Sequence, residues 1–207
     1  MDSQRRIIRG GSVLLEGQRI SAVGKSDEIS RIDTARVINA HDMVVTPGFV
    51  NGHCHISYAH ATRGVFPDDL GSEYLGNVFR LQSSMSPEEE HFTSLLAITE
   101  LLSYGTTTIM DPGSTKHVEA CMGAYEQSGL RIITGTQITD QENPYRMPVY
   151  THDEALNTTQ TFINQFNGTL EGRVTAWAMP FSPEYVSGGL LTAVSYTHLT
   201  LPTILLV

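Results

Sequence analysis

The sequence has 207 residues, of which 40% are hydrophobic and 17% charged, and a formal net charge of −9 at pH 7. This apolar content is enough for a core and excludes a disordered chain, and an acidic chain whose lysines are Lys25 and Lys116 offers no basic face to nucleic acid. Two cysteines and the absence of an apolar secretion signal at the start predict a cytoplasmic protein without a disulfide framework.

The first 45 residues are typical of short strands separated by turns. Alternating apolar and polar residues predict a half-buried strand in residues 18–23, after a first strand in residues 12–15. The turn between them is expected at Glu16-Gly17-Gln18. A further short strand is expected at residues 35–38. We interpret residues 1–45 as a domain of its own, a small β unit.

From residue 46 onward the pattern changes to alternating strands and helices. A buried strand is expected up to Asn51, and an irregular segment over residues 56–85. Ser86, Pro87 and Glu89 mark a helix start, as the N-cap, the first helical residue and the partner in a capping box. We expect that helix to bury Phe92, Leu95, Leu96, Thr99 and Leu102. Further strands are predicted at residues 106–110, 130–135 and 173–179, with helices at residues 115–128 and 153–166.

Four strands joined by helical crossovers indicate a parallel sheet. A doubly wound sheet would need a glycine-rich phosphate turn after its first strand, and residues 48–52 (GFVNG) do not supply one. A TIM (β/α)8 barrel places its chemistry at the carboxyl ends of its strands, which is where His53 and His55 stand. We therefore predict an α/β fold in which residues 46–190 form part of a TIM (β/α)8 barrel, with about four β/α units.

His53 and His55 form a candidate metal-binding pair. A single residue separates them at the end of a strand, so both imidazoles face the same side and Cys54 faces the other. Two neutral imidazoles suit zinc or iron, and a catalytic site usually takes three protein ligands and keeps a position for water. Such a triplet by itself is more often structural. Its place at the end of the first barrel strand favours the metal role.

Residues 46–55 (TPGFVNGHCH) resemble the signature of the amidohydrolase superfamily, in which the first barrel strand ends in Pro-Gly, four residues and the two histidines. Residues 103–111 are similar to the family's second helix-to-strand junction, and residues 11–24 to strands of its N-terminal β-sandwich. The similarity extends over residues 7–190. Within the superfamily the chain most resembles the ring deaminases and chlorohydrolases.

The resemblance implies a metal-dependent hydrolase barrel, here partial, preceded by an incomplete small β-sandwich. It implies that His53 and His55 bind a divalent metal ion that activates water for attack on an sp² carbon. The expected reaction is hydrolysis of a carbon–nitrogen bond other than a peptide bond, by deamination of an amino-substituted heterocycle. Members with two metal ions carry a carboxylated lysine at the end of the fourth strand, and residues 173–182 contain no lysine. We therefore predict a single ion, zinc rather than iron.

Other polar residues near the pair have two interpretations each. Related deaminases place substrate contacts in the loop after the histidines, so we predict that His60 and Arg63 bind substrate, with a solvated loop as the alternative. Asp111 ends a strand on the same side, but Asp111-Pro112-Gly113 is also a turn sequence, and we favour the turn. Cys54 and Cys121 are expected to be packed thiols. The catalytic acid and base stay unassigned.

Residues 191–207 differ from the rest of the chain because they contain no charged residue. They resemble a translated sequencing adapter, and we interpret them as a non-native tail. Interspersed Ser, Thr and Pro residues disfavour a membrane anchor. Because about half of a barrel and two metal ligands are present, we expect these 207 residues by themselves to be inactive.

Three alternatives are open at this point. The first is a hydrolase of cyclic amides, similar to dihydroorotase or imidazolone hydrolase. The second is a non-catalytic truncated paralogue that associates with full-length subunits, and the third is a structural β/α protein with incidental histidines. The predicted partner is a small-molecule substrate, with neither nucleic acid nor membrane, and the full-length protein could assemble as a homo-oligomer.

Overall fold

The computed structural model describes residues 6–30, 32, 36–71, 73–113 and 115–200. The chain divides into two compact units, Met1–Pro47 and Gly48–Val207. The first unit contains strands β1 and β2, and the second contains every other helix and strand that is described. Among these described helices, none combines the length and the apolar content that crossing a membrane requires.

The strands are β1 (Gly11–Glu16), β2 (Arg19–Lys25), β3 (Phe49–Asn51), β4 (Thr106–Met110), β5 (Arg131–Thr134), β6 (Gln137–Ile138), β7 (Val174–Ala176) and β8 (Met179–Pro180). The helices are α1 (Ile56–Thr62), the 3-10 turn η1 (Asp68–Leu70), α2 (Glu73–Ser84), α3 (Pro87–Ser103), α4 (Val118–Ser128), α5 (His152–Phe166), α6 (Thr169–Gly172) and α7 (Gly188–Thr200).

Strands β1 and β2 form the antiparallel hairpin that the sequence predicts, with Glu16 opposite Arg19 at the turn. Gly17 has a φ of +59°, in the left-handed region that tight hairpin turns require. The further strand expected at residues 35–38 is wrong, because residues 36–38 belong to no strand, and residue 35 lies outside the described residues. Val37 and Ile38 are exposed, so no packing favours an extended conformation there.

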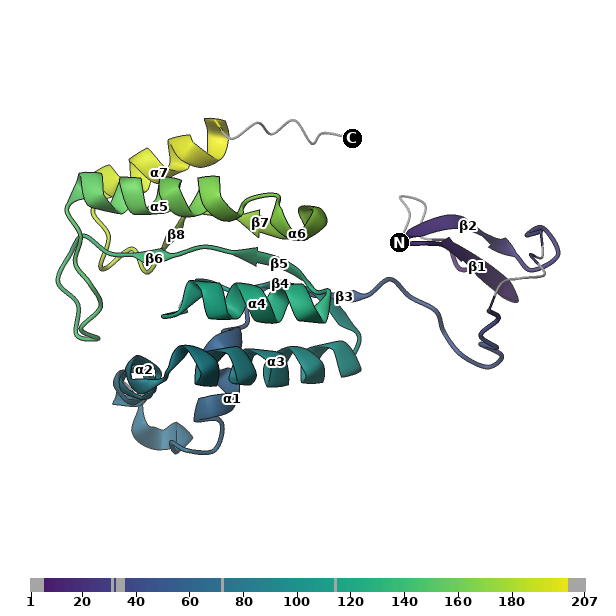
Figure 1. Ribbon diagram of the computed structural model, residues 1–207, viewed down its shortest axis with the longest axis horizontal. Helices are drawn as coiled ribbons and strands as arrows, with labels where there is room; N and C mark the ends of the chain where they lie inside the picture. The colour runs from purple at the N-terminus through teal and green to yellow at the C-terminus, as the bar shows by residue number, and fades with distance from the viewer. Residues whose placement is uncertain (1–5, 31, 33–35, 72, 114, 201–207) are drawn as a thin grey trace. The chain divides into compact units, whose positions relative to one another are not determined.

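The second unit is built on a parallel sheet with the strand order β3-β4-β5-β7. Strands β6 and β8 continue beyond β5 and β7 and pair with each other, also in parallel. Figure 1 shows α3 beside α4 and α7 beside α5, along the strands. The four expected strand regions are therefore formed, in the expected order and direction. Each crossover returns the chain to the same end of the sheet, so the carboxyl ends of the strands lie together.

The main core lies between this sheet and its helices. Ile109 of β4 and Ile132 of β5 share a fully buried cluster with Ile98 of α3 and Tyr125 of α4. Cys121 is also buried in this cluster, as expected for a packed thiol. Strand β3, by contrast, is not the buried strand that the sequence suggests. It lies at the edge of the sheet, and Phe49 and Val50 are 61% and 68% exposed.

The start of α3 is confirmed, and of its expected buried face Leu95 packs against the main core as a partly buried residue. Ser86 and Glu89 form both hydrogen bonds of a capping box. However, Phe92 and Leu96 are 59% and 57% exposed, whereas Glu90, Ser94, Ala97 and Ile98 are buried. Helix α3 contacts both α1 and α4, and small residues on that face let the helices approach closely.

The segment 56–85 is not irregular, as the sequence analysis expects, but holds α1, η1 and α2. Tyr74, Val78 and Leu81 lie on one face of α2, at a helical spacing of four and three residues. This face packs in a separate cluster with Tyr58 of α1 and Met85. The pocket described below lies against this cluster.

Helix α7 begins at Gly188. Its Leu190 and Val194 are buried against Ala155 of α5. The predicted boundary at residue 191 thus falls within α7, and residues 201–207 of the predicted tail lie outside the described residues. The non-native origin of residues 191–207 stays a prediction.

Two glycines allow the backbone to pack closely beyond the carboxyl ends of the strands. A Cβ atom on Gly113, which follows β4, would collide with the carbonyl oxygen of Gly135. A Cβ atom on Gly135, which follows β5, would collide with the carbonyl oxygen of Trp177. These turns therefore have no room for a side chain.

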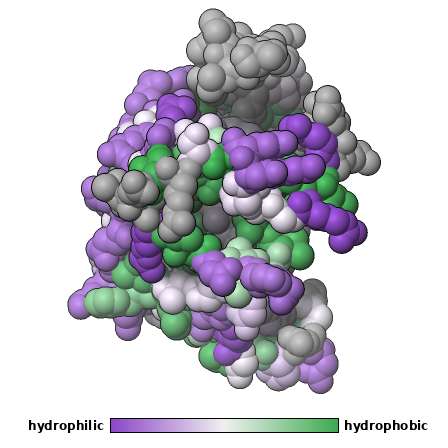
Figure 2. Space-filling view, turned by 90° about the vertical axis from the view of Figure 1, so that its right-hand side faces the viewer, coloured by the Kyte–Doolittle hydropathy of each residue, from purple (hydrophilic) through white to green (hydrophobic). Residues whose placement is uncertain are grey.

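Large apolar side chains also reach the surface. On the face shown in Figure 2, hydrophobic residues lie between hydrophilic ones. In the second unit the exposed apolar residues include Phe49 and Val50 of β3, and in the first unit Leu15 of β1 and Ile20 of β2. Exposed apolar residues on an edge strand favour association with another chain.

Candidate active site

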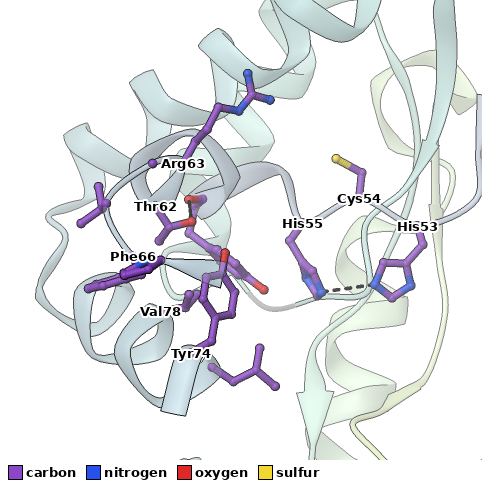
Figure 3. Close-up of a pocket in the computed structure, with 13 residues that line it drawn as sticks. His53, Cys54, His55, Thr62, Arg63, Phe66, Tyr74 and Val78 are labelled. Atoms are coloured by element: carbon purple, nitrogen blue, oxygen red, sulfur yellow. Dashed lines mark hydrogen bonds between the residues drawn. The ribbon is translucent and has the colours of Figure 1, made fainter. Parts of the chain in front are cut away.

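The two histidines of the predicted metal pair converge just beyond β3. Their Nε2 atoms lie 3.3 Å apart, and the rings meet edge to face with centroids 5.0 Å apart. Figure 3 shows the two rings facing each other while the Cys54 side chain points away. This is the orientation that alternation along an extended chain predicts for His53, Cys54 and His55.

The separation of the two ring nitrogens fits a shared metal ion. Two nitrogen ligands at about 2.0–2.1 Å from a tetrahedral zinc ion lie about 3.3–3.4 Å apart, which is the length of a tetrahedral edge. The observed 3.3 Å between the Nε2 atoms of His53 and His55 agrees with that edge. It is long for a hydrogen bond between the rings. The donor set therefore fits a divalent ion such as zinc.

His55 is held in its neutral form. Burial, followed by the proximity of His53, lowers the pKa of His55 to about 4. The ring also stacks on Tyr58 of α1, with centroids 5.1 Å apart and planes inclined by 23°. A histidine must be neutral to bind a metal ion, so His55 is ready to bind at neutral pH.

Cys54 plays a packing role in this arrangement. Its side chain lies against the main core cluster, on the side opposite to the two imidazoles. Burial, and to a lesser extent the Asp111 carboxylate, raises the pKa of the Cys54 thiol. The thiol is therefore protonated at neutral pH, in agreement with the packed thiol that the sequence predicts.

A pocket of about 870 Å³ opens beside the histidine pair. His53 and His55 line one side of it, and α1 and α2 contribute aromatic and aliphatic side chains on the other. These wall residues include Tyr58 of α1 and Tyr74 and Val78 of α2, and Phe66 joins them from the loop after α1. The sequence analysis missed them, although the helical spacing of Tyr74 and Val78 is a signal that could have found them. The pocket offers flat apolar walls next to the two imidazoles of the predicted metal pair.

His60 and Arg63, the predicted substrate contacts, both bind Glu100 of α3. The Arg63 guanidinium donates to both carboxylate oxygens at 2.7 and 3.1 Å, and Nε2 of His60 lies 2.8 Å from Oε2. The Arg63 and His60 hydrogen bonds lower the pKa of Glu100 to about 2. Arg63 also lines the pocket, but Figure 3 shows its side chain pointing away from the histidine pair. Substrate contact by either residue stays a prediction.

Asp111 follows β4 and is completely buried. Its Oδ1 accepts the amide of Gly113 at 3.2 Å, which forms the turn that the sequence favours. Its Oδ2 accepts the hydroxyl of Tyr125 at 3.2 Å. Burial outweighs these hydrogen bonds and raises the pKa of Asp111 to about 6. The sequence analysis did not find the contact with Tyr125.

The histidine pair is an incomplete metal site within the described part of the chain. No group of three or more His, Cys, Asp or Glu residues in that part is arranged to hold a metal ion. As predicted ligands, the pair would supply two of the three protein ligands that a catalytic zinc ion usually has.

The fold and the pair together define a β/α-barrel protein with two candidate metal ligands at the carboxyl ends of its strands. Residues 44–195 match the model of the amidohydrolase family. The chain belongs to the amidohydrolase family, which confirms the resemblance found in its sequence.

Curated relatives and solved structures agree with this assignment. The chain is 30% identical over 174 residues to a 5-methylthioadenosine/S-adenosylhomocysteine deaminase of Carboxydothermus hydrogenoformans, covering 83% of this chain and 38% of that protein. It is 28% identical over 187 residues to a 5'-deoxyadenosine deaminase of Methanobrevibacter smithii, covering 90% of this chain and 41% of that protein. The chain therefore spans about two fifths of the length of these relatives.

Among solved structures, the fold superposes on an atrazine chlorohydrolase from Arthrobacter aurescens TC1 complexed with zinc, with a TM-score of 0.80 and 22% identity. The match covers 96% of this chain and 48% of that one. This confirms the predicted fold class, a partial TIM barrel.

Proposed function

We propose that this chain is part of a metal-dependent hydrolase that deaminates an amino-substituted heterocycle. The observation that carries the proposal is the 3.3 Å separation of the Nε2 atoms of His53 and His55, which equals the distance between two ligands of one zinc ion. The names of the curated relatives, which are deaminases of adenosine derivatives, support the reaction class. Hydrolysis of a cyclic amide has no comparable support.

In this proposal His53 and His55 hold one divalent ion, zinc rather than iron. When bound, such an ion lowers the pKa of a coordinated water to about 7 and so supplies hydroxide at neutral pH. His53 and His55 orient the ion through a segment fixed to the end of β4 by the hydrogen bond from the Cys54 amide to the Met110 carbonyl, 3.0 Å long. The zinc in the related chlorohydrolase supports the choice of metal.

The pocket beside the pair is the proposed substrate site. Its aromatic walls, Tyr58, Phe66 and Tyr74, suit a planar ring. Arg63 lies at its edge, and His60 keeps a buried Nδ1 without a hydrogen-bond partner among the described residues. His60, Arg63 and Glu100 form a hydrogen-bonded group, the Glu100 cluster. We propose that His60 and Arg63 contact the substrate while they also bind Glu100.

We propose a cytoplasmic location, which the unpaired cysteines support, and a small molecule as the partner. Assembly of the full-length protein into a homo-oligomer belongs to the same proposal.

Zinc binding to the 207-residue chain tests the metal site directly. Isothermal titration with zinc chloride should show one site in the wild type. His53→Ala and His55→Ala should each weaken zinc binding more than about tenfold, because loss of an outer-sphere partner alone typically costs about that much. His152→Ala changes an exposed histidine at the start of α5 and is the matched control. Wild-type affinity in His53→Ala would contradict the proposal.

The reaction itself is tested on a longer reading frame that contains the remaining barrel strands. Ammonia release should be measured with methylthioadenosine, 5'-deoxyadenosine and guanine as substrates. We expect release with at least one of them, abolished in His53→Ala, and no turnover by the 207 residues alone. Hydrolysis of a cyclic amide with no ammonia from any of the three would favour the alternative.

A further inference from the structure

The end of α2 nearest to α3 is held by two side chains from the loop that follows β4. Nζ of Lys116 donates to the carbonyl of Ser83 at 2.6 Å and to that of Met85 at 3.4 Å. Nε2 of His117 lies 3.0 Å from the same Met85 carbonyl. A carbonyl oxygen only accepts, so Nε2 of His117 carries a proton in this contact. We call Lys116 and His117 the α2 clamp.

The clamp satisfies carbonyls at a helix end, where the helix itself supplies no partner. The last four carbonyls of an α-helix lack an intrahelical donor, and lysine and histidine side chains are favourable partners for them. The last turn of α2, residues 81–84 (LQSS), contains no basic residue. The donors come instead from residues 32 and 33 positions further along the chain. The position of this helix end therefore depends on tertiary contacts.

A buried carboxylate holds the backbone of the clamp. Glu90 of α3 is completely buried, and its Oε1 accepts the amide of Lys116 at 2.9 Å. Its Oε2 accepts the amide of His117 at 2.6 Å. His117 is the N-cap residue of α4, but its side chain makes no capping hydrogen bond there. With both amides bound to one carboxylate, the chain direction is fixed at this point, and the two side chains extend to α2.

The held end of α2 is continuous with the wall of the pocket beside the histidine pair. Tyr74 and Val78 of α2 line this pocket together with Tyr58 of α1 (Figure 3). Met85, whose carbonyl the clamp holds, is buried in one cluster with Tyr58 and Val78. The rings of Tyr58 and Phe79 of α2 also meet edge to face, with centroids 6.3 Å apart. A shift of the end of α2 would therefore change the spacing between the two helices that bound the pocket.

We propose that Lys116 and His117 are positioning residues that set the width of the substrate pocket by holding the end of α2. The inference rests on the proposed function, in which this pocket takes the substrate. Neither residue lines the pocket, so neither touches the substrate. They act through the distance between the α2 wall and α1, on which the fit of a planar ring depends.

Two double variants of the 207-residue chain separate the donated hydrogen bonds from other effects of substitution. The donor-free variant, Lys116→Met with His117→Ala, removes the hydrogen bonds to α2 and leaves both backbone amides on Glu90. The donor-retaining variant, Lys116→Arg with His117→Gln, keeps a donor at each position. Lys116 is exposed and His117 half-buried, so we expect both variants to fold, which circular dichroism checks.

Ligand affinity and ring spacing are the two measurements. Isothermal titration with methylthioadenosine gives the affinity, and the NMR cross-peak between the rings of Tyr58 and Phe79 reports the distance between α1 and α2. In the donor-free variant we expect the affinity to fall at least about threefold and the cross-peak to weaken. In the donor-retaining variant both should stay at their wild-type values.

Three results would overturn the positioning role when the wild type binds methylthioadenosine. The first is a donor-free variant with wild-type affinity and cross-peak, and the second is a change in one of these measurements without the other. The third is an equal loss in the donor-retaining variant. If the wild type does not bind methylthioadenosine, the proposed substrate site fails, and the cross-peak in the two double variants alone decides whether the clamp positions α2.

Discussion

The buried carboxylate of Asp111 makes the stability of the fold depend on pH. Burial raises its pKa from 3.8 to about 6, so the folded state holds a proton more tightly than the unfolded state does. The contribution is fully present below pH 3.8 and is lost as the pH rises through about 6. Above that pH the effect of Asp111 on the free energy of unfolding no longer changes with pH.

Asp111→Asn removes this titration, and we predict a corresponding change in the pH profile. The difference in unfolding free energy between the variant and the wild type should grow in favour of the variant from about pH 4 to about pH 6, and then level off. Urea unfolding followed by circular dichroism at a series of pH values measures it. Two profiles that run parallel across this range would show that Asp111 does not titrate there.

Residues that act through the local chain could be predicted from the sequence, and those that act through distant partners could not. His53 and His55 lie two residues apart, and strand alternation alone predicts that their rings share a side. Glu100, by contrast, meets Arg63 across 37 residues of sequence. Only the packing of α1 on α3 brings them together, and no local pattern reports that packing.

At the scale of elements, the Glu100 cluster joins the end of α1 to α3 through the hydrogen bonds of His60 and Arg63 with Glu100. Hydrogen bonds from Arg63 first, and then from His60, lower the pKa of Glu100 to about 2. Because the pKa is lower in the folded state, the stabilisation is present above the ordinary pKa of 4.5 and is lost as the pH falls toward about 2.

Glu100→Gln should therefore loosen α1 at neutral pH. We expect faster hydrogen exchange at the amides of α1, and a wild-type protein that approaches the behaviour of the variant as the pH falls below 4.5. Glu88→Gln, an exposed glutamate in the first turn of the same helix α3, is the control. Equal exchange of α1 in the Glu100→Gln and Glu88→Gln proteins at neutral pH would mean that the cluster does not hold α1.

Helix starts were predictable, and helix faces were not, for a physical reason. The capping box of Ser86 and Glu89 satisfies backbone amides within four residues, so it determines the start of α3 wherever the helix packs. The buried face depends on which neighbours approach. In α3 the neighbours α1 and α4 select Ser94 and Ala97 over the larger Phe92 and Leu96.

At the scale of the whole molecule, the sheet ends at β3 with exposed apolar residues. Among the described strands, β3 pairs with β4 alone, and Val50 is 68% exposed. An edge of this kind is a template for pairing with another chain. We expect the purified 207-residue chain to self-associate.

Val50→Lys places a charge on this edge and should increase the monomeric fraction in sedimentation velocity. Leu15→Lys is the control, because Leu15 is 64% exposed and belongs to the first unit. If the two lysine variants raise the monomeric fraction equally, association does not proceed through β3.

The close contacts of Gly113 and Gly135 have a consequence for how this scaffold could acquire new specificities. At those two turns, backbone touches backbone, and even a methyl group would force neighbouring strands apart. The rim there is closed to variation. The segment between His55 and Ser86 carries the pocket wall, so substitutions in its helices can reshape the pocket without altering these two turns.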